Sequence, residues 1–313
     1  MSPSAALESP VFRTYVIAVL SVLVIAGVAI AVVQFGLKRN VASVWKTYTG
    51  WLIMIPLVVG CLFLGRYATI GGLCLVSIFG VKEFARATGL YRDWWLTGIV
   101  YLGVIGLFIL AAVTDPRLGS LGWYGLYMVM PVYVVCLTLA IPIVRDRTKG
   151  HLQQVSLAIL GFVYIGWMFG HLALLTNREH AYEYLLFLIL AVELNDVAAF
   201  TCGKLFGKRR LLPNISPNKT WAGSIGAAVF SMAFVFAMQF TFPHFGPLQL
   251  VLTGLIIGVG GQFGDLSISF IKRDIGVKDM GAAIPGHGGI LDRIDSLIFV
   301  APLFFHMTRW FYG

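Results

Sequence analysis

The sequence predicts an all-α protein that crosses a membrane about nine to ten times. Of its 313 residues, 58% are hydrophobic and 12% are charged, whereas soluble domains carry about 25% charged side chains. This composition excludes the soluble globular, disordered, collagen-like, nucleic-acid-binding and disulfide-rich secreted classes. Apolar runs near twenty residues are the second observation. Each run is expected to be helical, because no water reaches the bilayer core to satisfy free peptide groups.

Ten apolar runs are candidate spans. They are 14–36, 49–65, 67–81, 95–113, 123–143, 153–175, 184–202, 221–242, 248–272 and 294–310. The first run is too long for the core of a cleaved signal peptide, so we expect it to remain as a span. The second and third runs are short and are separated only by Gly65, Arg66 and Tyr67. They are compatible with a tight hairpin or with a single irregular passage, which would leave nine spans.

The cysteines lie inside apolar runs and form no CxxC pair, so we interpret them as small hydrophobic residues rather than as metal or redox ligands. They are Cys61, Cys74, Cys136 and Cys202. The glycines of the ninth run recur at about four-residue spacing, which favours close helix packing. They are Gly254, Gly258, Gly260, Gly261 and Gly264.

The distribution of Lys and Arg predicts the orientation, because these residues collect in cytoplasmic loops. In a ten-span arrangement, one set of alternate loops holds all but five of the 23 basic residues. The five on the other side are Arg13, Arg66, Arg117, Arg178 and Arg309. Both termini are therefore expected to face outward. The net charge of +9 also favours contact with anionic lipid headgroups.

Acidic residues gather near the C-terminus, where five of the fourteen lie within 31 positions. These are Asp265, Asp274, Asp279, Asp292 and Asp295. Asp265, Ser269 and Lys272 follow steps of four and three, so a carboxylate, a hydroxyl and an ammonium share one helical stripe. Asp292 and Asp295 share a face at the start of the last span.

This constellation suits a metal-bound polyphosphate. Separated carboxylates hold a hard cation such as Mg²⁺, while basic side chains neutralise phosphate charge. The basic residues are Lys272, Arg273, Lys278 and Arg293. Gly286, Gly288 and Gly289 let backbone N–H groups approach an anion just before a helix N-terminus.

The charge pattern alone leaves alternatives open. Intramembrane acids also line ion pathways in transporters, and a glycine-rich connection can be a simple tight turn. Neither a Walker loop nor a GxGxxG motif is present, so soluble nucleotide-binding folds contribute nothing to the interpretation.

Two stretches carry a family resemblance. The first reads Ser269-x2-Lys272-Arg273-x4-Lys278-Asp279-x-Gly281-x2-Ile284-Pro285-x-His287-Gly288-Gly289-x2-Asp292-Arg293-x-Asp295. The second reads Asp196-x2-Ala199-Phe200-x2-Gly203-Lys204-x-Phe206-Gly207-Lys208, followed by Ser216-Pro217-x-Lys219-Thr220-Trp221-x-Gly223. Together they resemble the phosphatidate cytidylyltransferases, also called CDP-diacylglycerol synthases, over 193–295. The resemblance divides the chain into N-terminal membrane helices, 1–183, and a C-terminal catalytic membrane region, 184–313.

The resemblance implies that CTP and phosphatidate react to give CDP-diacylglycerol and pyrophosphate. It implies Asp265 and Asp292 as ligands of a shared Mg²⁺, with Asp295 and Asp196 as additional or supporting ligands. It also implies a second, monovalent cation such as K⁺ and a homodimer. We expect membrane lipids as partners and no nucleic acid.

Substrate contacts are assigned on the same basis. Lys219, Ser216 and Thr220 are candidates for CTP contacts, with a solvated basic loop as the alternative. Ser269, Lys272 and Arg273 are expected to hold substrate phosphate, the alternative being that they only cap the helix and snorkel. Other residues expected at the phosphates are Lys278, His287, Gly288, Gly289 and Arg293, and a turn-stabilising role is equally open for His287.

Two positions depart from the family pattern. Asn218 stands where a Lys is usual, and Ala222 stands where a Glu is usual. One cation and one carboxylate are therefore missing. These departures keep two alternatives open beside the main prediction: a different lipid phosphate as substrate and a catalytically impaired homologue. The charge pattern keeps a third open, a membrane transporter.

The charge distribution places 203–220 and 273–293 on the cytoplasmic side, where CTP is available. We expect an active-site cavity, open to cytoplasm and bilayer, among the last four spans.

Overall fold

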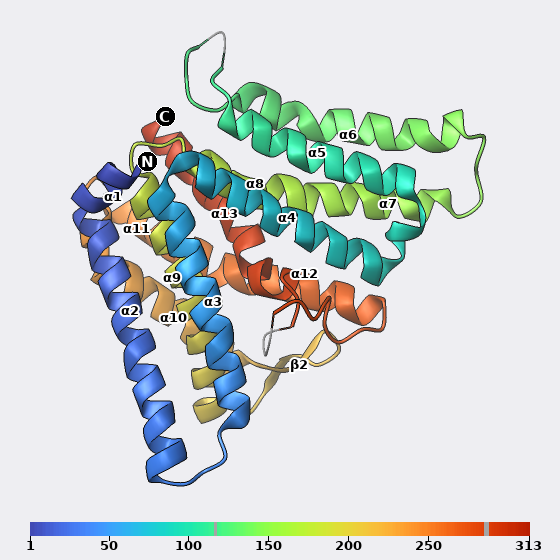
Figure 1. The fold of residues 1–313 in the computed structure, drawn as a ribbon. Helices are drawn as coiled ribbons and strands as arrows, with labels where there is room; N and C mark the ends of the chain where they lie inside the picture. Colours follow the sequence, from blue (N-terminus) through green and yellow to red (C-terminus); the bar gives the residue numbers. More distant parts are fainter. Residues whose placement is uncertain (116–117, 285–287) are drawn as a thin grey trace.

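The computed structural model describes residues 1–115, 118–284 and 288–313, and helices dominate it (Figure 1). The first part of the chain forms α1 (Pro3–Glu8), α2 (Pro10–Ala31) with its π-helical continuation η1 (Val32–Gly36), α3 (Ala42–Leu64), α4 (Arg66–Thr88), the 3-10 turn η2 (Leu90–Arg92), α5 (Trp94–Ala112) and α6 (Tyr124–Val144). Of the residues named above, Arg117, Pro285, Gly286 and His287 lie outside the described residues.

The second part begins with one long helical rod of α7 (His151–Leu160), η3 (Gly161–Met168) and α8 (Phe169–Leu175). It continues with α9 (Ala181–Phe206), the hairpin β1 (Arg210–Leu212) and β2 (Ser216–Thr220), α10 (Trp221–Ala237) and the 3-10 turn η4 (Gln239–Thr241). The last segments are α11 (Pro247–Leu255), η5 (Ile256–Gly260), α12 (Gly261–Asp274) and α13 (Leu291–Tyr312).

The all-α, polytopic class predicted from the sequence is confirmed. Within the described residues, eight helices are long and apolar enough to cross a membrane. The other two predicted spans are α10, which is apolar but has only 17 residues, and α13, which carries charged residues in its first turn. Every predicted run therefore forms a helix, although α10 differs from an ordinary span in length and α13 differs in polarity.

The second and third runs form separate helices, α3 and α4. Gly65 lies between them with φ +102°, a conformation that an L side chain disfavours. The hairpin alternative is thus observed, rather than the single irregular passage. Helix α3 begins at Ala42, well before the apolar run, because backbone hydrogen bonding continues through the polar residues that precede the run.

Alternate connections meet at the same end of the molecule, as a ten-helix path requires. At the end that carries both termini (Figure 1), the Ser2 N–H donates to the Tyr182 hydroxyl at 3.1 Å. Nearby, the Arg66 guanidinium donates to the Asn177 side chain at 2.5 Å. Three segments therefore meet at this end: the N-terminus, the α3–α4 junction and the α8–α9 connection.

The opposite end joins the connections rich in Lys and Arg. Arg145, after α6, pairs with Asp93, before α5, at 2.9 Å. Farther along, the Nε of Arg273 donates to the Ile215 carbonyl at 3.3 Å. Each contact therefore joins two of the connections that the charge count places on one side, the α4–α5 connection with the α6–α7 connection and the β-hairpin with the end of α12.

The predicted close packing of the ninth run is confirmed for three of its glycines. A Cβ added at Gly254 would lie 3.1 Å from the Met232 Cα, and one added at Gly258 would lie 2.9 Å from the Ala228 Cα. At Gly264 it would lie 2.8 Å from the Ser296 Cα. Helices α10 and α13 therefore approach this helix backbone to backbone.

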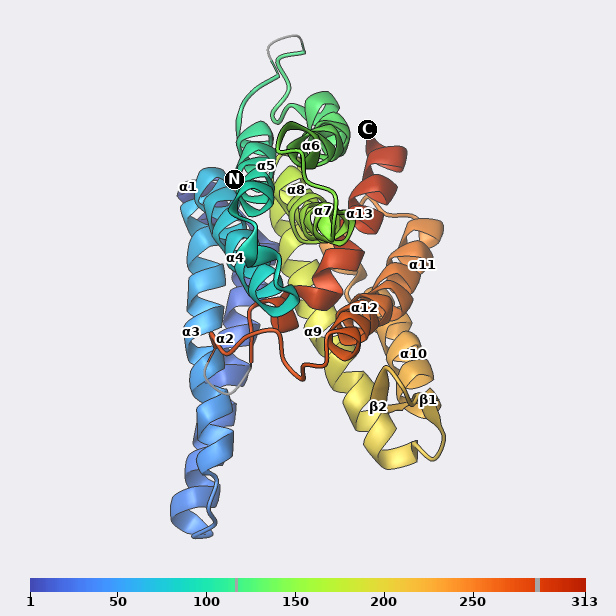
Figure 2. The same ribbon diagram turned by 90° about the vertical axis from the view of Figure 1, so that its right-hand side faces the viewer.

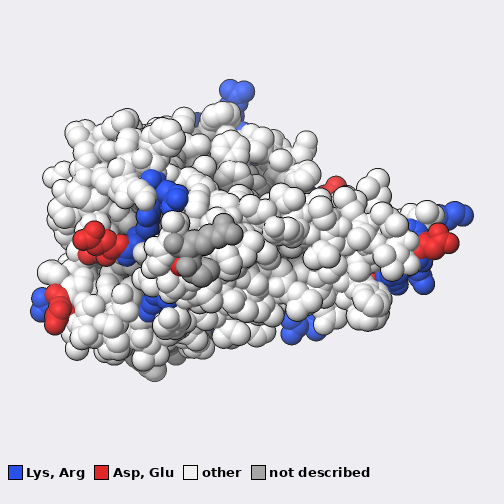
Figure 3. Space-filling model, turned by 90° about the horizontal axis from the view of Figure 1, so that it is seen from above, with Lys and Arg blue, Asp and Glu red and all other residues white. Residues whose placement is uncertain are grey.

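Apolar side chains also cover much of the outer surface. Helices α2 and α3 extend beyond the rest of the molecule as a hairpin (Figure 2), and most of their residues are not buried. Seen from above the view of Figure 1, the surface is mostly free of charged side chains, and Lys, Arg, Asp and Glu gather in a few small patches (Figure 3). Such a surface is suited to contact with lipid rather than water.

Candidate active site

The polar residues that were predicted to share one stripe lie on one face of α12. The Ser269 hydroxyl donates to the Asp265 carboxylate at 3.3 Å. One turn farther on, the Lys272 ammonium reaches Asp292 of α13 at 2.8 Å. Residues at steps of four and three thus line one face of α12, and that face meets α13.

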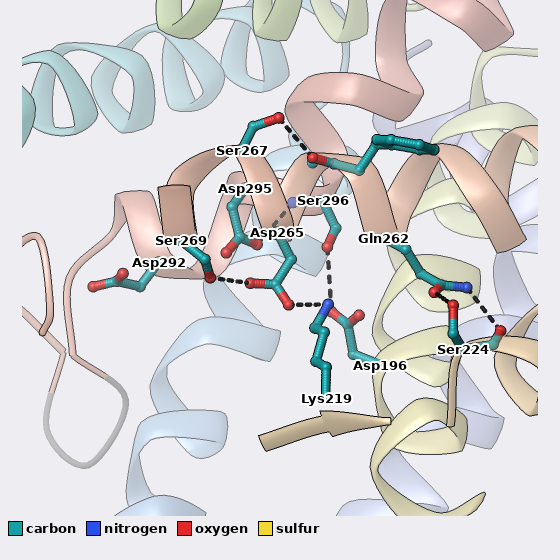
Figure 4. Close-up of polar contacts among 12 residues, drawn as sticks. Asp196, Lys219, Ser224, Gln262, Asp265, Ser267, Ser269, Asp292, Asp295 and Ser296 are labelled. Atoms are coloured by element: carbon teal, nitrogen blue, oxygen red, sulfur yellow. Dashed lines mark hydrogen bonds and ion pairs between the residues drawn. The ribbon is translucent and has the colours of Figure 1, made fainter. Parts of the chain in front are cut away.

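Asp265 lies at the centre of a group of charged side chains from four elements (Figure 4). Lys219 of β2 forms an ion pair with it. Asp196 of α9 and Asp295 of α13 lie close enough to Asp265 to interact with it electrostatically. The Ser296 hydroxyl donates to Asp196 at 3.4 Å. The two sequence stretches therefore fold into one site.

Asp292 lies beside this group but is held differently. Its carboxylate points away from Asp265 (Figure 4) and is only 8% exposed. One oxygen accepts from Lys272, and the other accepts from the Met280 and Gly289 backbone N–H groups, both at 3.1 Å. Asp292 therefore holds the connection between α12 and α13 in place through hydrogen bonds from two of its backbone N–H groups.

The acidic side chains of this group are the candidates for holding a metal ion. Within the described ranges, no group of three or more His, Cys, Asp or Glu side chains is arranged to hold one. Lys219 and Lys272 instead contact the oxygens of Asp265 and Asp292. Asp196, Asp265 and Asp295 come from three helices and supply carboxylate oxygens, the ligands that Mg²⁺ prefers, so the chemistry of the donors suits a hard cation although their arrangement in this structure does not hold one. Binding at Asp265 would require Lys219 to move.

The β-hairpin positions Lys219 but gives its neighbours structural roles. Strands β1 and β2 are antiparallel, with Leu212 opposite Ser216. The Thr220 hydroxyl accepts from the Gly223 N–H at 3.1 Å and so caps α10. Of the three residues predicted to contact CTP from this segment, Lys219 alone contacts the acidic group.

The remaining candidates lie around this group. The side chains of Arg273 and Lys278 are exposed. The Arg293 Nε is buried and has no hydrogen-bond partner among the described residues. Gly288 has φ +80°, and its carbonyl accepts from the Ile284 N–H at 2.9 Å. His287 cannot be placed, since it lies outside the described residues.

Two cavities of similar size lie away from this group. One of about 470 Å³ lies between α6 and α7, and one of about 480 Å³ lies beside His180 and His244 at the end that carries the termini. The predicted cavity among the last four spans stays a prediction.

Sequence reasoning assigned no role to Glu83. This residue of α4 accepts hydrogen bonds from the backbone N–H groups of Ile290 and Leu291, at 3.0 and 2.9 Å. The only sequence signal is a single carboxylate between Lys82 and Arg86 near the end of an apolar helix. Its partners are backbone groups, so no residue pattern could have identified them.

Comparison with known proteins shows the family of the chain. The model of the cytidylyltransferase family matches residues 45–311. An uncharacterised Escherichia coli protein, YnbB, is 33% identical over 270 residues, covering 85% of this chain and 86% of that protein. The phosphatidate cytidylyltransferase of Staphylococcus saprophyticus is 34% identical over 235 residues, covering 74% and 89%. That of Staphylococcus aureus is 40% identical over 162 residues, covering 51% and 61%. The chain belongs to the cytidylyltransferase family.

Proposed function

We propose that this protein transfers the cytidylyl group of CTP to phosphatidate, giving CDP-diacylglycerol and pyrophosphate. The observation that carries the proposal is the convergence of both signature stretches on Asp265, which Lys219 contacts from one stretch and Ser269 from the other. Relatives whose names state this activity support the choice of substrates.

The chemistry asks mainly for charge neutralisation and alignment. An oxygen of the lipid phosphate attacks the α-phosphorus of CTP, the bond from that phosphorus to the bridging oxygen breaks, and pyrophosphate leaves. The attacking phosphate is already substantially ionised at neutral pH, so no strong base is required. Lys219, Lys272, Arg273 and Arg293 would neutralise the phosphates, with Arg giving the more directional contacts.

The same proposal includes Mg²⁺ at the acidic group. Asp265, Asp196 and Asp295 would hold it, and Asp292 would join them by turning toward Asp265 and giving up its contacts with Lys272 and with the Met280 and Gly289 N–H groups. Bound Mg²⁺ supplies positive charge at the reacting phosphates. A nearby monovalent cation such as K⁺ belongs to the proposal as well.

The setting follows from the same reasoning. We place the active site on the cytoplasmic face, since it lies at the end rich in Lys and Arg. Phosphatidate would enter from the adjoining leaflet. The family resemblance also supports a homodimer, surrounded by membrane lipids and with no nucleic acid partner.

The test is an assay of purified protein with CTP labelled on its α-phosphate, Mg²⁺ and phosphatidate. We expect label in the lipid product, release of one pyrophosphate per lipid, and loss of both on chelation of Mg²⁺. A panel of other lipid phosphates tests the alternative that the departures at Asn218 and Ala222 favour. CTP binding without turnover on any lipid would contradict the proposal and indicate an impaired homologue, whereas solute flux without nucleotide would indicate a transporter.

A further inference from the structure

The start of α13 is capped by a residue from a distant part of the chain. The residue at its N-cap, Ile290, makes no capping hydrogen bond through its side chain. Each oxygen of the Glu83 carboxylate accepts one of the two backbone N–H groups there, from Ile290 and from Leu291. A carboxylate at this position satisfies free N–H groups and interacts favourably with the helix dipole.

Two glycines make room for this carboxylate. A Cβ at Gly289 would lie 2.5 Å from a Glu83 oxygen and 2.8 Å from the Gly281 backbone nitrogen. A Cβ at Gly281 would also collide with the Glu83 carboxylate. The middle of the connection between α12 and α13, at Gly281, and its last residues, at Gly289, therefore both pack against Glu83.

Glu83 and Asp292 both contact the connection between α12 and α13. Gly289, next to the capped N–H groups, donates its own N–H to Asp292 at 3.1 Å. Asp292 lies one residue after Leu291 and pairs with Lys272. A shift of the first turn of α13 would therefore change the position of Asp292 relative to Lys272. Lys272 is one of the residues proposed to hold substrate phosphate.

We infer that Glu83 is a positioning residue for the proposed cytidylyl transfer: its carboxylate, provided by the N-terminal membrane helices, fixes the first turn of α13 and thereby Asp292. The inference rests on the proposed function. Glu83 contacts backbone groups and acts through Asp292 rather than on substrate.

The test compares Glu83→Gln and Glu83→Asp with a matched control, Asp93→Asn. Asp93 also caps a helix, since its carboxylate accepts from the Trp95 and Leu96 N–H groups at 3.1 and 3.4 Å, but it caps α5 and does not touch the connection. Glu83→Gln places an amide N–H against a backbone N–H and loses one hydrogen bond. Glu83→Asp keeps the charge with a shorter reach.

We expect kcat to fall by about 10- to 100-fold in Glu83→Gln, the range typical of lost supporting contacts, with a smaller change in KM for CTP. Glu83→Asp should recover part of the loss, and Asp93→Asn should stay near the original kcat. Amide hydrogen exchange supplies a readout without substrate, and we expect faster exchange over 288–292 in Glu83→Gln only.

Equal kcat and equal exchange over 288–292 in Glu83→Gln and Asp93→Asn would overturn the inference. If the unsubstituted protein itself shows no CTP-dependent turnover, the proposed function fails. The exchange measurement still decides whether Glu83 holds the start of α13.

Discussion

At the level of single residues, the two central aspartates are held by different partners. Asp265 pairs with Lys219 and accepts from Ser269, whereas Asp292 pairs with Lys272 and accepts two backbone N–H groups. A ligand therefore has to displace only one lysine, Lys219, in order to bind Asp265. Asp292 combines a charge at the site with a structural role.

This difference predicts distinct outcomes for two isosteric substitutions. Asp265→Asn and Asp292→Asn should each lower kcat by about 100-fold or more, since each removes a charge where phosphate chemistry is proposed. Asp292→Asn should also lower the thermal midpoint, because it leaves buried N–H groups and Lys272 poorly paired. Activity assays and thermal unfolding in detergent measure both effects.

Asp146→Asn is the matched control. Asp146 is exposed, lies outside the signature stretches and has φ +46°, a conformation that Asn tolerates well. Wild-type turnover in Asp292→Asn would remove this residue from the proposed chemistry.

At the level of helices, glycine decides how closely α12 approaches α13. Gly264 precedes Asp265, and an added Cβ would meet the backbone of Asp295 and Ser296. The absence of a side chain at this one position therefore lets the two acid-bearing helices pack next to each other.

Gly264→Ala should destabilise the protein by about 1–3 kcal/mol, the usual cost of overpacking, and should lower kcat by moving Asp265 relative to Asp295. Gly98→Ala on α5 is the control, since a Cβ there meets nothing within 4 Å and Ala is the better helix former. Unfolding and turnover measured on both variants give the comparison, and equal stability in the two would contradict the packing argument.

At the level of the whole molecule, alternate connections gather at two ends, and the proposed site lies at the end rich in Lys and Arg. Contacts such as Arg145 with Asp93 define that end. Contacts such as Ser2 with Tyr182 define the other. This arrangement predicts a definite pattern of accessibility in the membrane.

In a background without native cysteines, Leu118→Cys should react with a membrane-impermeant thiol reagent added to intact cells. Asn214→Cys should react only after permeabilisation. Leu118 lies in the α5–α6 connection and is 79% exposed, and Asn214 is exposed in the turn of the β-hairpin. Labelling of both from the same side would contradict the two-ended arrangement. Labelling in the reverse order would contradict the proposed cytoplasmic active site.

Hydrophobic runs and motif spacing were sufficient to predict much of the fold. Each apolar run forms a helix, since an uninterrupted apolar segment has few other ways to satisfy its backbone in lipid. The stripe from Asp265 to Lys272 follows from helical periodicity alone. Helix ends were less predictable, as at Ala42, because backbone hydrogen bonding does not stop where hydrophobicity does.

Composition and residue spacing were enough to predict the class of the protein and the helical stripe on α12, and they supplied the acidic and basic candidates for the site. Tertiary structure alone decided that Asp265 faces Asp196 and Asp295, that Asp292 turns toward the α12–α13 connection, and that Glu83 caps α13. The physical reason is that periodicity specifies neighbours within one helix, whereas contacts between helices depend on how closely backbones approach, and backbone N–H groups carry no sequence signature.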